Sequence, residues 1–175
     1  PPTDFDDAYM ALRYAHHLLD GNGVAWNPGE PWVYGMTSRL HFLWVLLLRA
    51  AFPSLGPAAV LRAASGGMAV ALLVAMPLAL TLFGRPRRYG LAFWSALVIP
   101  AIGFSEAFRF HAASGMDTLL GALTNLFVVV ATLRLSQGPT PGRVWAAVAA
   151  GSVAVLARPE NALPALLCPL LALWF

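Results

Sequence analysis

The sequence predicts an all-α fold, a polytopic bundle of transmembrane helices with a long first loop outside the membrane. Of its 175 residues, 59% are hydrophobic and 11% are charged, whereas an average soluble domain is about 45–50% apolar and about 25% charged. Uncharged stretches recur at lengths near the roughly 20 residues that a helix needs to cross the hydrocarbon core. The net charge of +3 is spread along the chain, so we expect no nucleic-acid partner.

Five stretches are predicted to span the membrane. The clearest is 63–84, because no charge interrupts it and membrane helices tolerate its internal Gly and Pro. The others are 89–105, 118–134, 144–157 and 161–175. Between the last two lies Arg158-Pro159-Glu160, where proline favours a turn over one long helix. We therefore divide the chain into a first loop, 1–56, and a transmembrane region, 57–175, and expect both to belong to a longer protein.

The order of charges predicts which side of the membrane each loop faces. Arg85, Arg87 and Arg88 form one loop, Arg134 and Arg143 flank another, and neither loop holds an acid. Because cytoplasmic loops collect Arg and Lys, we place both in the cytoplasm. All eight acids then face the extracytoplasmic side: Asp4, Asp6, Asp7, Asp20, Glu30, Glu106, Asp117 and Glu160. The alternative is that acids avoid spans and sort between the two sides by chance.

The first loop is predicted to hold amphipathic helices at the membrane interface. One helix, capped by Asp4 or Asp6, should run to about Asp20 and end at Gly21. Its apolar residues recur at helical spacing, which suits the interface. Residues 40–52 are apolar but too short to span, so we expect them to lie on the membrane or dip into it.

Three carboxylates at the start of the first loop are candidates for chemistry. Asp4, Asp6 and Asp7 fall within four positions, and clustered carboxylates repel one another. Holding them together raises a pKa or recruits a cation, so they suit a general base or a metal site. The structural alternative is a solvated helix start, where Asp caps backbone N–H groups and complements the dipole.

A second polar group follows the second and fourth predicted spans: Glu106, Arg109, His111, Asp117, Arg158 and Glu160. Arg109 and Arg158 could grip a phosphate through their guanidinium forks. The alternative is that each arginine only neutralises a neighbouring acid. A lone residue such as His111 is more often an ordinary hydrogen-bonding group than a ligand, and Asn125 is expected to hydrogen-bond between helices.

Three motif-bearing segments occur in a recognisable order. The first comprises 6–15, 21–30 and 34–38, the second is Ser114-Gly115-Met116-Asp117-Thr118, and the third is Ala157-Arg158-Pro159-Glu160. Together they resemble the GT-C type membrane glycosyltransferases that use polyprenyl-phosphate sugars, closest to arabinofuranosyltransferase-like and mannosyltransferase-like bacterial members. The resemblance implies an integral protein of the bacterial plasma membrane with its acidic loops on the extracytoplasmic side.

The resemblance also implies transfer of a sugar from a polyprenyl-phosphate donor to a glycan or other hydroxyl acceptor, with inversion at the anomeric carbon. Asp6 is then the general base, and Asp7 orients the acceptor or helps Asp6 to hold a divalent cation such as Mg²⁺, Mn²⁺ or Ca²⁺. Arg109 and Arg158 would neutralise the departing phosphate. Further substrate-binding candidates are His111, Asp117 and Glu160.

The chain departs from the family pattern at Trp32, Met36 and 39–41, and no Pro follows Ser38. This leaves acceptor specificity open and is compatible with a divergent or inactive member. Two other classes compete: a transporter or flippase-like module, and a non-catalytic membrane assembly subunit. A transporter should carry ionisable residues near the midplane of its spans, whereas 63–84, 89–105 and 118–133 hold none there, which favours the enzyme. The fragment alone is not expected to catalyse.

Overall fold

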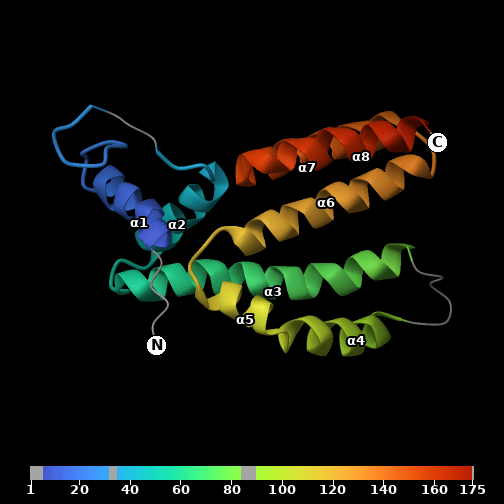
Figure 1. Ribbon diagram of the computed structural model, residues 1–175, viewed down its shortest axis with the longest axis horizontal. Helices are drawn as coiled ribbons and strands as arrows, with labels where there is room; N and C mark the ends of the chain where they lie inside the picture. Colours follow the sequence, from blue (N-terminus) through green and yellow to red (C-terminus); the bar gives the residue numbers. More distant parts are fainter. Residues whose placement is uncertain (1–5, 32–34, 84–89, 175) are drawn as a thin grey trace.

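The computed structural model describes residues 6–31, 35–83 and 90–174, without the side chains of Asp6 and Phe83. Within these ranges the chain is all-α, as predicted, with eight α-helices and no strand (Figure 1). The helices are α1 (Asp6–Leu19), α2 (Arg39–Ala51), α3 (Pro57–Phe83), α4 (Leu91–Gly103), α5 (Glu106–Ala113), α6 (Thr118–Ser136), α7 (Pro141–Ala157) and α8 (Ala162–Trp174), with a 3-10 turn at Pro159–Asn161. Predictions that concern Asp4, Trp32, Arg85, Arg87 and Arg88 lie outside the described residues.

Two helices are each long and apolar enough to cross a membrane. They are α3, over Pro57–Leu82, and α6. A third candidate span consists of α4 and α5 together, which meet at a bend of 76°. Helix α7 is apolar but has only 17 residues. The described residues therefore indicate a membrane location with two or three candidate spans, although helices form in all five stretches where spans are predicted.

The region between the second and third predicted spans contains a helix that the sequence did not predict. Helix α4 ends at Gly103, and a separate helix, α5, starts at Glu106. Ser105 has an extended backbone (φ −60°, ψ 131°) that interrupts the helical path. Glu106 then lies in the first turn of α5, where a negative charge complements the helix dipole.

Helices α3, α4, α6, α7 and α8 lie along the long axis of the molecule, α5 is bent by 76° from α4, and α1 and α2 gather at one end (Figure 1). Helix α6 packs against α3, α7 and α8, while α1 packs mainly against α2. The turn between α6 and α7, which Arg134 and Arg143 flank, lies at the opposite end from α1 and α2 (Figure 1). The acid-bearing helix α1 and this basic turn are therefore separated along the bundle, as the topology prediction requires.

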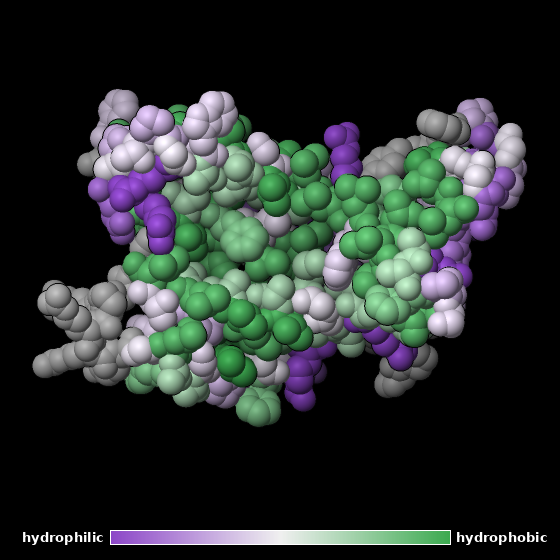
Figure 2. All heavy atoms as spheres, turned by 180° about the vertical axis from the view of Figure 1, so that it is seen from behind, coloured by the Kyte–Doolittle hydropathy of each residue, from purple (hydrophilic) through white to green (hydrophobic). Residues whose placement is uncertain are grey.

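The surface of the bundle is suited to lipid. Figure 2 shows hydrophobic residues over most of the visible face of the helices. Large apolar side chains such as Leu166, Leu170 and Val70 are more than half exposed. A soluble protein rarely exposes so much contiguous apolar surface, so the bilayer is the natural environment of these helices.

The helix predicted in the first loop forms as α1, and it packs against other helices of the protein. It ends at Leu19, and Gly21 adopts the left-handed backbone (φ 81°) that ends many helices. Its buried residues Ala8, Leu12 and Ala15 share a core with α2 and α3. This packing attaches the start of α1 to the end of the bundle where α6 begins.

Candidate functional site

A cavity of about 320 Å³ lies where four separate parts of the chain meet, and we call it the polar cavity. Its polar side chains are those of Asp7, Thr37, Ser38, His41, Asp117 and Arg158. Met10, Met36 and Met116 supply much of the apolar lining. The cavity therefore unites side chains from α1, from α2 and the segment before it, from the start of α6 and from the end of α7.

Helix ends position the acid and the arginine of the polar cavity. Asp117 directly precedes α6, and Arg158 directly follows α7 with an extended backbone (φ −153°, ψ 123°). Helices α6 and α7 are consecutive and packed side by side, so the beginning of one lies beside the end of the other. The turn after Arg158 is held by Asn161, whose side-chain oxygen accepts from Asn125 Nδ2 at 3.0 Å. The predicted interhelical bond of Asn125 is thus confirmed.

Arg158 carries the positive charge of the polar cavity. Its Nε lies 2.7 Å from Glu160 Oε1 and 3.9 Å from Asp117 Oδ2. The Asp117 side chain is only 13% exposed, whereas that of Glu160 is 58% exposed. Structural pairing with Glu160 is therefore present, but it uses Nε. The Arg158 side chain is 34% exposed, so the pair does not bury its guanidinium.

Gly121 gives the Arg158 side chain its place against α6. A Cβ atom at Gly121 would lie 2.7 Å from Arg158 Cδ, closer than real Cβ contacts occur. The aliphatic stem of Arg158 thus runs directly over the α6 backbone, and any larger residue at position 121 would displace it.

A tight turn built on Gly115 sets the wall of the polar cavity before Asp117. Gly115 has φ +74°, and a Cβ there would lie 2.8 Å from Leu61 Cβ of α3. Its N–H donates to Ser65 Oγ at 3.1 Å, and the Ser65 hydroxyl donates to the Ala112 carbonyl at 2.8 Å. A serine buried in a membrane-span candidate therefore anchors the segment that carries Asp117. Sequence reasoning gave Ser65 no role, because its partner is about 50 positions away.

His41 is the functional candidate that sequence reasoning missed. It is only 6% exposed, and neither ring nitrogen has a hydrogen-bond partner among the described residues. Burial lowers the pKa of His41 below its usual value near 6.5, while Asp117 and the Gly115 backbone act in the opposite direction. The ring is therefore neutral at pH 7. Its one sequence signal is that it falls in 39–41, where the chain departs from the family pattern.

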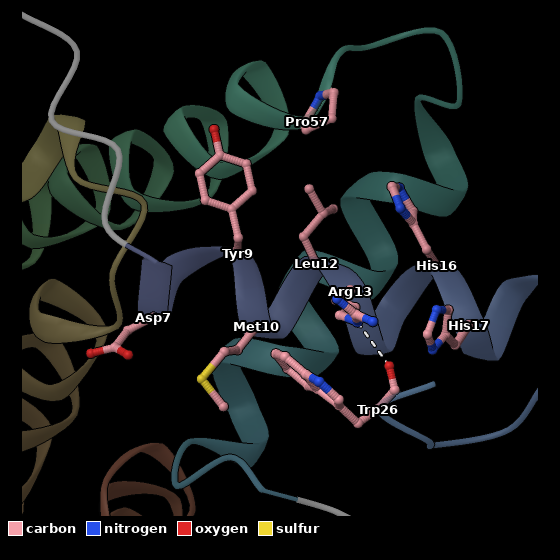
Figure 3. Close-up of a pocket in the computed structure, with 9 residues that line it drawn as sticks. All are labelled: Asp7, Tyr9, Met10, Leu12, Arg13, His16, His17, Trp26 and Pro57. Atoms are coloured by element: carbon pink, nitrogen blue, oxygen red, sulfur yellow. Dashed lines mark hydrogen bonds between the residues drawn. The ribbon is translucent and has the colours of Figure 1, made fainter. Parts of the chain in front are cut away.

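A second, larger concavity of about 580 Å³ borders the polar cavity, and we call it the Trp26 groove (Figure 3). Asp7 and Met10 line both. Figure 3 shows Asp7 at one end of the groove, with its carboxylate directed away from Tyr9 and His16. The boundary between the two sites is therefore the first turn and a half of α1.

Polar side chains of the Trp26 groove bind the loop that follows α1. Arg13 Nε donates to the Trp26 carbonyl at 2.8 Å, and Nη2 donates to Asn27 Oδ1 at 2.7 Å. The guanidinium carbon also lies 4.4 Å from the centroid of the Trp26 ring. His17 Nδ1 lies 2.7 Å from the Ala25 carbonyl oxygen. These contacts hold the loop against the helix and occupy Arg13 and His17.

The remaining predicted site residues lie apart from the polar cavity or outside the description. Arg109 and His111 are on α5 and line neither the polar cavity nor the Trp26 groove. Arg109 forms no ion pair with any described residue, so its expected pairing with an acid is not seen there. Asp6 begins α1, but its side chain is outside the described atoms, so its role as base stays a prediction.

The predicted cation site also depends on side chains outside the description. Within the described ranges, no three His, Cys, Asp or Glu residues are grouped closely enough to hold a metal ion. The polar cavity offers the carboxylates of Asp7 and Asp117, and Asp117 already lies near Arg158. A cation held by Asp6 and Asp7 therefore stays a prediction from the resemblance.

Comparison with known proteins does not assign the chain to a family. No family model, no curated protein and no solved structure matches it. Function must therefore be argued from the residues of the polar cavity and from the resemblance of their segments.

Proposed function

We propose that the protein transfers a glycosyl group from a polyprenyl-phosphate sugar to a hydroxyl acceptor at the outer face of the membrane. The observation that carries this proposal is the composition of the polar cavity. Its lining includes Asp7 and Thr37 from the first resembling segment, Asp117 from the second and Arg158 from the third. Three segments separated along the chain have a reason to converge if they serve one substrate.

The chemistry of the proposed reaction matches the charges around the polar cavity. The acceptor hydroxyl attacks the anomeric carbon, the bond from that carbon to the phosphate oxygen breaks, and the phosphate leaves with the electron pair. Asp6 takes the hydroxyl proton, and Asp7 orients the acceptor. Arg158 directs its terminal nitrogens to the phosphate, whose negative charge grows as the sugar departs.

An apolar groove beside Arg158 suits the lipid part of such a donor. It measures about 660 Å³ and is lined mainly by apolar side chains of α7 and α8. Its lining includes Leu156 and Ala162, which flank the Arg158 turn in the chain, and extends to Val144 and Leu173. An isoprenoid chain lying there would remain in contact with the bilayer while its phosphate reached Arg158.

The test is sugar transfer by the protein in membranes. Wild type is supplied with a panel of polyprenyl-phosphate sugars and glycan acceptors, and transfer is measured beside Asp6→Asn and Asp7→Asn. Removing a general base should lower the rate about 10²- to 10⁴-fold, so Asp6→Asn should show the larger loss. Binding of the donor should survive in both variants, because neither acid is assigned to the phosphate.

Asp20→Asn is the matched control, since Asp20 is an exposed acid just beyond the far end of α1. Its transfer rate should equal that of wild type. Donor binding without transfer by wild type, across the whole panel, would overturn the proposed function. Full transfer by Asp6→Asn would overturn the assignment of the base.

A further inference from the structure

We propose that His41 is a phosphate-binding residue, which donates a ring N–H to the same phosphate group that Arg158 holds by charge. The proposal rests on the proposed function for the lipid attached to this phosphate. It concerns a residue outside the segments that carry the family resemblance, and it is argued from the packing of the polar cavity.

Unsatisfied polar atoms single out His41. Neither buried ring nitrogen makes a hydrogen bond of ordinary geometry with a described residue, although the Gly115 backbone lies close enough to act on the pKa of the ring. Among the described residues no other side chain has two such atoms. Buried polar groups in native proteins are nearly always hydrogen-bonded, so an exception calls for an unseen partner. Because His41 lines the polar cavity, a ligand in that cavity can supply the partner.

The surroundings of His41 favour an anion with several oxygens. Asp7, Asp117 and Arg158 are the charged groups that line the cavity with it. Arg158 pairs with Glu160, whose side chain is 58% exposed, and the planar guanidinium fork matches phosphate oxygens. The negative charge of Asp117 disfavours a bound anion, and the positive charge of Arg158 compensates for this. A neutral imidazole adds a hydrogen-bond donor without a further charge, and its second nitrogen can accept from a water or a sugar hydroxyl.

The local sequence explains why this histidine reaches the cavity. Ser38 precedes α2 and its Oγ accepts from the backbone N–H of His41 at 3.2 Å, which caps the helix. His41 therefore lies in the first turn of α2, with Phe42 and Val45 buried in the core shared with α1 and α3.

The experiment measures binding of polyprenyl monophosphate to the whole protein in lipid nanodiscs, for wild type, His41→Phe and His41→Gln. His41→Phe should weaken the affinity about 10- to 100-fold, the range for a hydrogen bond to a charged group. His41→Gln should retain most of the affinity, because its amide N–H can still donate. The thermal stability of ligand-free His41→Phe should equal or exceed that of wild type. If His41 had a purely structural role, this substitution would lower the thermal stability.

His16→Phe is the matched control. His16 also has a buried ring nitrogen without a described partner, but it lines the Trp26 groove and not the polar cavity. Its affinity for polyprenyl monophosphate should equal that of wild type. Inorganic phosphate should compete in wild type, whereas polyprenol without phosphate should not, which separates headgroup recognition from tail binding.

Unchanged affinity of His41→Phe would overturn the inference. If His41→Phe also showed a raised KM for the acceptor, His41 would be assigned to the acceptor hydroxyl and not to the phosphate. If wild type binds polyprenyl monophosphate through His41 but transfers sugar from no donor, the proposed function fails while the phosphate site stands. If transfer is normal and insensitive to His41, the inference fails alone.

Discussion

The polar cavity and the Trp26 groove share Asp7 and Met10, yet their polar side chains are used differently. In the groove, Arg13 donates to the Trp26 carbonyl and to Asn27, so its guanidinium is occupied by the fold. In the cavity, Arg158 pairs with the exposed carboxylate of Glu160, and its own side chain is 34% exposed. Each site thus has one arginine, but only the arginine of the cavity is available to a ligand.

This difference shows that the size of a concavity is a poor guide to its function. The Trp26 groove is the larger of the two, at about 580 Å³ against about 320 Å³. Its Arg13 and His17 side chains are used to hold the loop after α1, whereas His16 Nε2 has no partner among the described residues. Unsatisfied buried groups, such as those of His41, are the better indicator of a ligand site.

The largest effect is expected where the wall of the polar cavity is tightest. Gly115→Ala forces a residue with a side chain into φ +74° and brings Cβ within 2.8 Å of Leu61 Cβ. The left-handed backbone and the overpacking together should cost about 3 kcal/mol, measured by thermal unfolding in detergent. Gly142→Ala is the control, because nothing lies within 4 Å of a Cβ there, and its stability should change little. Equal stability of Gly115→Ala and wild type would show that this turn does not support the cavity.

A pair of arginine variants should separate the two sites. Arg13→Ala should lower stability by about 1–2 kcal/mol, since it removes two hydrogen bonds and a cation–π contact from the fold. Arg158→Ala should cost less than about 1 kcal/mol, because its close pair with Glu160 is partly exposed. Its affinity for polyprenyl monophosphate should instead fall about 10- to 100-fold.

Unfolding and phosphate binding should be measured for both variants. If Arg13→Ala and Arg158→Ala behaved alike in both measurements, the two sites would not differ as proposed. Loss of phosphate affinity in Arg13→Ala, at temperatures where it is folded, would assign the ligand to the Trp26 groove. Loss of stability alone in Arg158→Ala would make the cavity arginine a structural residue.

Local patterns predicted the features that depend on neighbours in the sequence. The span at 63–84 overlaps α3, the turn at Arg158-Pro159-Glu160 separates α7 from α8, and Asn125 bonds across helices. Each follows from apolar length, proline or a polar group in an apolar helix. Helix α5 was not predicted, because the charged and polar residues that follow the span at 89–105 also suit a loop.

The contents of the polar cavity could be predicted only in part. Asp7, Asp117 and Arg158 were candidates because of their charge and motif context. His41 and Ser65 were not, because a histidine or serine in an apolar helix has the same local pattern whether it faces lipid, core or ligand. Their roles depend on how α1, α2, α3 and α6 pack together, and this packing cannot be predicted from any one local segment of the sequence.

The smallest effect, and the one that sharpens the comparison most, is the response of the two buried histidines to pH. Burial lowers the pKa of both; Asp117 opposes this at His41, while at His16 Arg49 adds to it and Asp20 opposes it. The unfolded chain takes up these protons below about pH 6.5, but the folded chain resists until the pH is lower. The stability that the neutral rings confer is therefore present above pH 6.5 and is lost as the pH falls.

Melting temperatures between pH 7.5 and 5 should accordingly decrease in wild type, and the decrease should be smaller in His16→Phe and in His41→Phe. Saturating polyprenyl monophosphate should then distinguish the two histidines. A bound phosphate favours a protonated ring beside it, so the ligand should remove the pH dependence that His41 contributes and leave that of His16 in place. If the ligand leaves both contributions unchanged, the phosphate does not contact His41, and the polar cavity and the Trp26 groove differ less than their hydrogen bonds indicate.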